Sequence, residues 1–180
     1  MRYKHDWNAG IDISALAVEP GLSADNSGGM VMKKNSIDAI RAMIDGGVNL
    51  VDTAPIYGNG HSEEVVGKAL ENGYREKVFL ATKFSISNDE NGAVINNGSY
   101  ENAIWECEQS LKRLNTDHID IYIMHWPDPA TPVEVTMKAL ADLKKSGKNK
   151  LSEDDKFMSK RNLMVKNKHQ SDCIRNRLGD

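Results

Sequence analysis

The sequence predicts an α/β fold built from a parallel sheet with helices packed against it. Three short runs rich in apolar and β-branched residues, "VNLVD", "KVFLATK" and "IDIYIMH", are typical of buried strands. Before, between and after them, residues 36–148 carry segments whose apolar residues recur at helical spacing. Strands and helices that alternate in this way indicate right-handed βαβ units. With 180 residues, the chain is long enough for one such domain with a sizeable core.

The first two helices are expected in the segments "SIDAIRAMIDGG" and "SEEVVGKALENG". The first places Ile37, Ile40 and Ile44 at helical spacing and ends at two glycines, a common C-terminal signal. The second has Ser62 as a candidate N-cap and two glutamates in its first turn, where the helix dipole favours negative charge.

The third and fourth helices are expected in "SYENAIWECEQSLKRL" and "TPVEVTMKALADLKKSG". The third has an apolar stripe that runs from Ala103 to Leu114. The fourth has the clearest start signal, because Thr131 can cap, Pro132 suits the first turn and Glu134 completes a capping box.

The remaining segments are less regular. Residues 8–10 favour a turn in a short N-terminal hairpin, after which "ISALAV" is the expected first strand of the sheet. The polar segment 85–99 predicts a loop. Residues 149–180 hold 8 Lys and Arg against 5 Asp and Glu and show no clear apolar period, so we expect a divergent, basic and poorly ordered tail after a domain at residues 1–148.

Composition narrows the class of protein. A net charge of −3 does not favour a nucleic-acid or anionic-membrane partner. No apolar run approaches the roughly 20 residues of a membrane span, and the N-terminal residues lack the apolar core of a signal peptide. Cys107 and Cys173 are too few for a disulfide framework and are expected to be reduced thiols. We therefore expect a cytoplasmic protein.

Reactive side chains gather at the ends of the predicted strands. "VNLVD" ends in Asp52, "VFLATK" in Lys83 and "IDIYIMH" in His125, while Tyr57 follows shortly after the first of them. Neighbouring strands lie about 4.8 Å apart, and parallel strands end at one edge, so these groups should meet there. Taken singly, each has an ordinary structural explanation: a turn residue, a solvated charge, a core histidine and a loop anchor. Together they predict an active site.

These groups suggest transfer of a proton to an oxygen atom. A phenol has a reference pKa of about 10, and we expect the Lys83 ammonium to lower that of Tyr57 and make it a better acid. Asp52 would keep Lys83 charged and oriented, and His125 would donate a hydrogen bond to the same oxygen. A carbonyl oxygen needs such a proton when hydride attacks its carbon. No side chain supplies hydride, so a nicotinamide cofactor would be required.

The sequence resembles the aldo-keto reductase family. "VDTAPIYGNGHSEEVVGKAL", "LATK" and "IDIYIMHWPDP" are similar to the segments that bear that family's catalytic Asp, Tyr, Lys and His. The resemblance implies that Asp52, Tyr57, Lys83 and His125 form this tetrad, with Tyr57 as general acid and Asp52 near the nicotinamide. It further implies a (β/α)8 barrel of the TIM type and NADPH-dependent reduction of a small aldehyde or ketone. Trp126 would then form a wall for the substrate, or else be a buried structural residue.

The resemblance covers residues 1–148, which is about half of a family member. We therefore expect a barrel truncated to its first four βα units, preceded by a short hairpin. "AVEPGLSAD" stands where the family has a Gly-Thr-Trp-like segment that touches nicotinamide and substrate, and the family's phosphate site would lie beyond this half. Two interpretations remain: a reductase, or a truncated, non-catalytic remnant or interaction module. In either case open barrel edges favour self-association.

A metal site is not expected. The sequence has no H-x-H or H-E-x-x-H pair, which would be typical of zinc ligands. "GNGHSE" begins like a phosphate-binding G-x-G-x-x-G motif but has Glu63 at the position of the third glycine.

Overall fold

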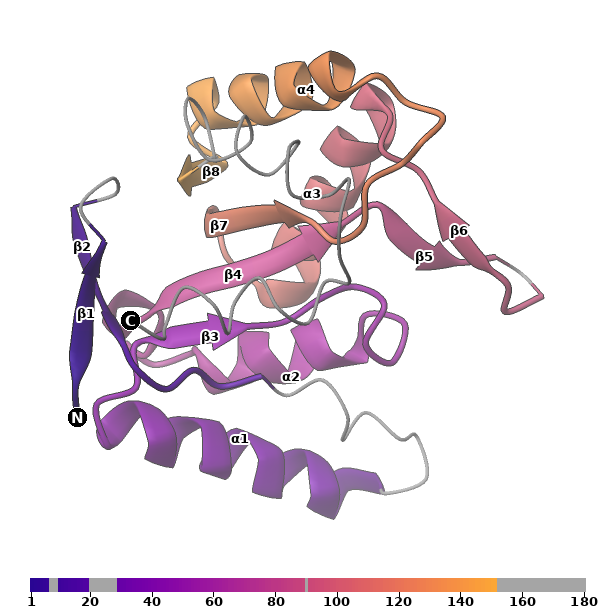
Figure 1. Ribbon diagram of the computed structural model, residues 1–180. Helices are drawn as coiled ribbons and strands as arrows, with labels where there is room; N and C mark the ends of the chain where they lie inside the picture. Colours follow the sequence, from indigo (N-terminus) through magenta and orange to yellow (C-terminus); the bar gives the residue numbers. More distant parts are fainter. Residues whose placement is uncertain (7–9, 20–28, 90, 152–180) are drawn as a thin grey trace.

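The computed structural model describes residues 1–6, 10–19, 29–89 and 91–151 of the 180-residue chain. Strands and helices alternate along it, and the four predicted helices are all present (Figure 1). The elements in chain order are β1 Tyr3–Asp6, β2 Ile11–Ser14, α1 Gly29–Asp45, β3 Leu50–Asp52, α2 His61–Ala69, the 3-10 helix η2 Arg75–Lys77, β4 Phe79–Phe84, β5 Ile86–Asn88, β6 Val94–Asn96, α3 Tyr100–Leu114, β7 Ile119–Met124, α4 Val133–Lys145 and β8 Asn149–Leu151.

The main sheet is parallel, as the sequence predicted. Its strands are ordered β3-β4-β7-β8, which is also their order in the chain. Helices α1 to α4 pack in sequence, each against the next, around one side of the sheet (Figure 1). This arrangement is that of the first part of a β/α barrel, in which the helices lie outside and the C-terminal ends of the strands share one edge.

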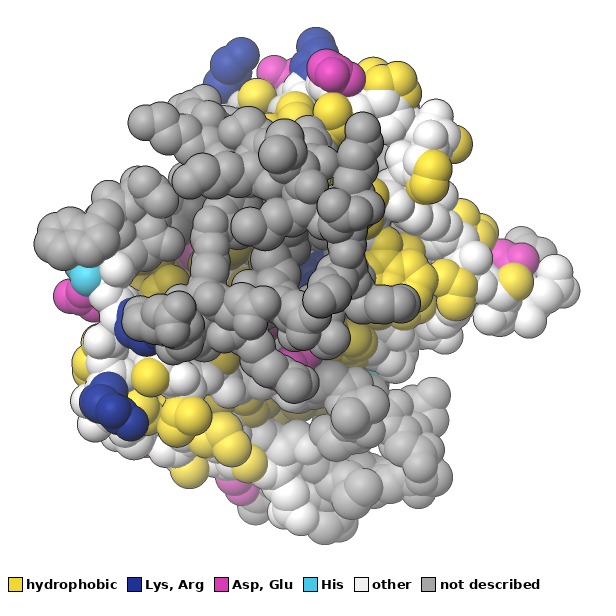
Figure 2. Space-filling view, viewed as in Figure 1, with side chains coloured by type: hydrophobic (Ala, Val, Ile, Leu, Met, Phe, Trp, Pro, Cys, Tyr) yellow, Lys and Arg dark blue, Asp and Glu magenta, His cyan; other side chains and the backbone are white. Residues whose placement is uncertain are grey.

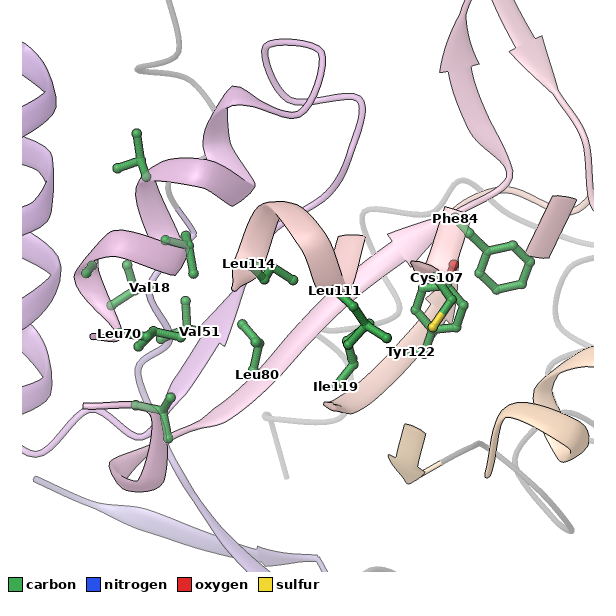
Figure 3. Close-up of a cluster of buried hydrophobic side chains, with 14 of the residues drawn as sticks. Val18, Val51, Leu70, Leu80, Phe84, Cys107, Leu111, Leu114, Ile119 and Tyr122 are labelled. Atoms are coloured by element: carbon green, nitrogen blue, oxygen red, sulfur yellow. The ribbon is translucent and has the colours of Figure 1, made fainter. Parts of the chain in front are cut away.

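The hydrophobic core lies between this sheet and its helices (Figure 3). Phe84 of β4 stacks on Tyr122 of β7 with ring centroids 4.8 Å apart, and the buried Tyr122 hydroxyl donates to the Ala103 carbonyl of α3 at 3.2 Å. Cys107 of α3 is a free thiol in the same cluster, and burial raises its pKa to about 12, so it stays protonated. The second cysteine, Cys173, lies outside the described residues.

The N-terminal hairpin is present, but the first sheet strand is shorter than expected. β1 and β2 pair antiparallel. The predicted strand "ISALAV" does not form in the main sheet. Its last residue, Val18, makes a single parallel bridge with Val51 of β3. The Val18 N–H donates to the Leu50 carbonyl at 3.0 Å, and the Val18 carbonyl accepts from the Asp52 N–H at 2.8 Å. This short contact fixes the chain next to the C-terminal end of β3.

Two predicted helix caps are wrong. α2 has no side-chain cap, because the buried Ser62 hydroxyl lies 3.0 Å from the Thr53 hydroxyl instead. α4 also lacks a side-chain cap: the residue before it is Pro132, and the Thr131 hydroxyl donates to Asp128 at 2.6 Å. In both cases another side chain takes the hydroxyl that was expected at the helix end: Thr53 at the end of β3 for Ser62, and Asp128 in the same loop for Thr131.

Strands also occur in two stretches where the sequence predicted none. The segment 85–99, expected to be a loop, contains the antiparallel hairpin β5–β6. β8, at residues 149–151, pairs parallel with β7, whereas sequence analysis placed these residues in the tail. The rest of that tail, residues 152–180, lies outside the described residues. Within the part of the chain that is described, no helix has the length and apolar character needed to cross a membrane.

Candidate active site

Alternation along the strands brings the predicted site residues to one face. Side chains in a strand point alternately to the two faces of its sheet. The sequence neighbours of Lys83 point toward the helices, so Lys83 points to the opposite, inner face. In β3 and β7, Val51 and Tyr122 pack in the core, which leaves Asp52 and His125 for the inner face. All three groups therefore lie at the same edge of the sheet.

Asp52 and Lys83 form a buried ion pair. The Lys83 Nζ atom donates to Asp52 Oδ1 at 2.7 Å and to the Thr53 carbonyl at 3.0 Å, and the two charged residues are 7% and 9% exposed. Burial raises the pKa of Asp52, and the charge and hydrogen bond of Lys83 oppose this effect. The ion pair allows both charges to be buried, whereas either charge buried alone would destabilise the folded state.

Tyr57 lies over this pair. It belongs to the turn that leaves β3, where its N–H donates to the Ala54 carbonyl at 3.1 Å. Lys83 Nζ is 5.3 Å from the centroid of the Tyr57 ring, and the His125 ring meets it edge-on at 6.0 Å and 88°. The structure thus brings together all four residues that sequence analysis singled out.

Glu19 also reaches this group, and sequence analysis did not identify it. The Tyr57 hydroxyl donates a hydrogen bond to Glu19 Oε1 at 3.0 Å. Burial raises the pKa of Tyr57, and the charge and hydrogen bond of Glu19 raise it further. The expectation of a lowered pKa is therefore wrong, because burial and the carboxylates of Glu19 and Asp52 all raise it. The one available hint was the departure of "AVEPGLSAD" from the family pattern.

His125 is neutral in this setting. Burial is the main cause, and the charge of Lys83 adds to it, so that the pKa of His125 falls to about 4. The His125 N–H of the backbone donates to the Phe84 carbonyl at 2.9 Å, which fixes the end of β7 against β4. A neutral imidazole has one N–H donor and one acceptor nitrogen.

Trp126 forms the outer border of the site. Trp126 is 48% exposed, and its ring centroid lies 6.4 Å from that of the His125 ring, so it is not a buried structural residue. Ser85, which has a φ of 85°, holds the Trp126 backbone by donating to its carbonyl at 2.7 Å and accepting from its N–H at 3.2 Å. Figure 2 shows apolar side chains near the β5–β6 hairpin, where Val94 and Ile95 are also exposed.

A second buried ion pair supports the turn that carries Tyr57. The side chain of Glu63 is fully buried, accepts from Arg113 Nε at 2.6 Å and accepts from the Thr82 hydroxyl at 2.7 Å. A Cβ atom at Gly60, whose φ is 91°, would lie 2.6 Å from Arg113 Cδ. Glycine at this position therefore lets α3 approach the turn closely. From the sequence, Glu63 was expected to interact with the dipole of helix α2, and its buried ion pair was not foreseen.

The donor set fits the reacting end of a reduced nicotinamide and a carbonyl compound. A phenol that keeps its proton, a neutral imidazole and a buried ion pair suit protonation of an oxygen that gains negative charge. Among the described residues, no group of three or more His, Cys, Asp or Glu is placed to hold a metal ion.

Comparison with known proteins identifies the relatives of this chain. The sequence profile of the Aldo/keto reductase family matches residues 21–151. The aldo-keto reductase YhdN of Bacillus subtilis is 41% identical over 149 residues, which are 82% of this chain and 45% of that protein. The chain thus spans about half the length of the relatives it matches.

Solved structures give the same picture. The thermostable aldo-keto reductase Tm1743, solved with the inhibitor epalrestat, matches with a TM-score of 0.72 and 30% identity over 83% of this chain and 52% of its own. An aldo-keto reductase from Klebsiella pneumoniae in complex with NADPH matches with a TM-score of 0.66 and 28% identity over 78% of this chain and 45% of its own. The predicted fold, part of a (β/α)8 barrel, is confirmed.

Proposed function

The chain belongs to the aldo/keto reductase family, and on that premise we propose that it carries the proton-donating part of an NADPH-dependent carbonyl reductase. Tyr57 is the general acid, the Lys83–Asp52 pair stabilises the phenolate that Tyr57 leaves, and His125 orients the carbonyl group of a small aldehyde or ketone. One observation carries the proposal: the Lys83 ammonium, 2.7 Å from Asp52, lies 5.3 Å from the centre of the Tyr57 ring.

Tyr57 can act as an acid because it keeps its proton. Its pKa is raised by burial and by Glu19, so the phenol is protonated at neutral pH. When bound, a reduced nicotinamide would supply hydride to the carbonyl carbon. The carbonyl oxygen then becomes basic enough to take the proton of a phenol within hydrogen-bond reach. The Lys83 ammonium stabilises the phenolate that remains.

His125 and Trp126 position the substrate in this proposal. With a pKa of about 4, the His125 imidazole is neutral at neutral pH, so its N–H can donate to the carbonyl oxygen without protonating it. Trp126, beside His125 and half exposed, supplies an apolar wall for the body of the substrate.

Asp52 is the residue that we propose to lie near the nicotinamide, since it occupies the inner face at the end of β3. The NADPH bound to the Klebsiella pneumoniae relative supports NADPH as the cofactor. The chain spans about half of such relatives.

Titration of NADPH fluorescence with the 180-residue chain tests this proposal. A saturable change in fluorescence, followed by oxidation of NADPH when 4-nitrobenzaldehyde is added, is the expected result. The exposed Glu71, in the turn after α2, offers a control: Glu71→Gln should bind and react like the unchanged protein. Absence of saturable binding would contradict the proposal.

A non-catalytic remnant or interaction module is the second candidate function. One observation favours it: the Tyr57 hydroxyl is already bonded to Glu19. On this alternative the tetrad persists as a buried structural network. The alternative predicts no NADPH binding but a clear loss of stability when Lys83 is replaced.

A further inference from the structure

The position of Glu19 is set by the short β-bridge between Val18 and Val51, next to β3. Its neighbour Val18 is bonded on both sides, through its N–H to Leu50 and through its carbonyl to the N–H of Asp52. These two hydrogen bonds fix the position of the backbone beside the C-terminal end of β3. The next side chain, that of Glu19, is exposed to solvent yet reaches Tyr57.

The Tyr57 hydroxyl has a single proton to donate, and Glu19 accepts it. The distance from the Tyr57 oxygen to Glu19 Oε1 is 3.0 Å, an ordinary hydrogen-bond length. A phenol has one O–H donor. While this contact exists, a carbonyl oxygen cannot accept the same proton, so the substrate must displace the carboxylate.

The charges that face Tyr57 come from three strand ends and from Glu19 itself. Asp52 from β3 and Lys83 from β4 form their own pair, and His125 after β7 is neutral at neutral pH. Among the residues that the structure describes, Glu19 thus adds a negative charge at the phenol beyond the Lys83–Asp52 pair. Both its charge and its hydrogen bond hold the proton on Tyr57.

We propose that Glu19 is a positioning and specificity-determining residue: it holds the Tyr57 hydroxyl until a carbonyl compound displaces it, and it disfavours carbonyl compounds that carry a negative charge. The selectivity part rests on the proposed role of Tyr57 as general acid. An anionic substrate would be repelled by Glu19, whereas a neutral or cationic one would not.

Fluorine NMR of the full chain labelled with 3-fluorotyrosine measures the contact without any turnover. The fluorine makes each phenol more acidic, and the Tyr57 signal is the one that disappears in Tyr57→Phe. We expect Glu19→Gln to lower the pH midpoint of this signal by about one unit and Glu19→Ala to lower it further, because only the alanine also removes the acceptor. Glu71→Gln, which removes an exposed carboxylate elsewhere, should leave it unchanged. An unchanged midpoint in both Glu19 variants overturns the inference.

The second readout is a ratio of kcat/KM values for two aldehydes that differ in charge, 4-carboxybenzaldehyde and 4-nitrobenzaldehyde. Glu19→Gln should raise the ratio in favour of the anionic aldehyde by about three- to tenfold. A ratio that does not change overturns the specificity role. If no variant reduces either aldehyde, the proposed function fails, and the midpoints alone decide whether Glu19 holds Tyr57.

Discussion

The Lys83 ammonium and the Asp52 carboxylate lie 2.7 Å apart and join the ends of two neighbouring strands, β3 and β4. Their side chains are 9% and 13% exposed, so the pair is largely shielded from water. Above it lies the ring of Tyr57. Each charge of the pair neutralises the other inside the site. We therefore expect the stability of the fold to depend on this ion pair.

Lys83→Met should therefore destabilise the fold. It leaves the Asp52 carboxylate buried without its partner, which costs about 3–5 kcal/mol in the free energy of unfolding. The matched control is Lys77→Met, because Lys77 pairs with Asp45 at 3.3 Å with both side chains about half exposed. We expect the control to cost less than about 1 kcal/mol. Urea denaturation measures both values, and equal losses would show that the buried pair has no special role.

Glu106→Gln should stabilise the protein at alkaline pH. Burial raises the pKa of Glu106 from 4.5 to about 7, so the folded state holds a proton that the unfolded state releases. The stability that this protonated carboxyl contributes is complete below about pH 4.5 and is lost as the pH rises through 7. At pH 8 the neutral variant should gain about 3 kcal/mol over the unchanged protein, and at pH 4 almost nothing.

Urea denaturation at both pH values checks this prediction. The exposed Glu101, on the same helix α3, offers a control, and Glu101→Gln should stay within about 0.5 kcal/mol at either pH. A gain for Glu106→Gln that is the same at pH 4 and pH 8 would rule out titration of this carboxyl as the cause.

His125 should remain neutral down to about pH 4. Its folded-state pKa lies below the ordinary 6.5, so the stability that its neutral form contributes is present above pH 6.5 and is lost as the pH falls through 4. The ring signals of His125 in nitrogen-detected NMR, assigned with His125→Gln, follow this titration directly. A midpoint near 6.5 would show that the imidazole is not buried beside Lys83.

The chain should associate with itself in solution. Among the described strands, β8 forms the edge of the main sheet, and the Asn149 side chain, 1% exposed, has no hydrogen-bond partner within the described part of the molecule. An open edge and a buried amide without a partner both favour pairing with another chain. Sedimentation velocity over a dilution series should show a dimer or larger species, whereas a compact, cooperatively folding monomer at all concentrations would contradict this.

The repeating part of the fold was predictable because its signals are local. Apolar periodicity and glycine stops define the helices, and runs such as "VFLATK" define the strands, within a few residues of the chain. β8 has no such signal, since its pairing with the distant strand β7 decides it. β5 and β6 pair with each other across a short connection, but their polar composition hides the strand from the sequence. The caps predicted at Ser62 and Thr131 are absent because other side chains bind their hydroxyls: Thr53 binds that of Ser62, and Asp128 in the same loop binds that of Thr131.

The candidate site was predictable to the extent that parallel strands align their ends. That rule brought Asp52, Lys83 and His125 together, and Tyr57 followed from its place in the next turn. The rule says nothing of Glu19, whose contact depends on how the chain crosses the end of β3. The sequence also led to the wrong direction for the Tyr57 pKa shift, because burial and the carboxylate of Glu19 raise this pKa.

Single-turnover reduction of 4-nitrobenzaldehyde by the chain saturated with NADPH, compared between the unchanged protein and Tyr57→Phe, tests the central claim most directly. The phenylalanine keeps the ring next to Lys83 but has no proton to give. We expect the rate to fall by about 10²- to 10⁴-fold while the affinity for NADPH stays the same. A Tyr57→Phe protein that reduces the aldehyde at the original rate would contradict the assignment of Tyr57 as the acid.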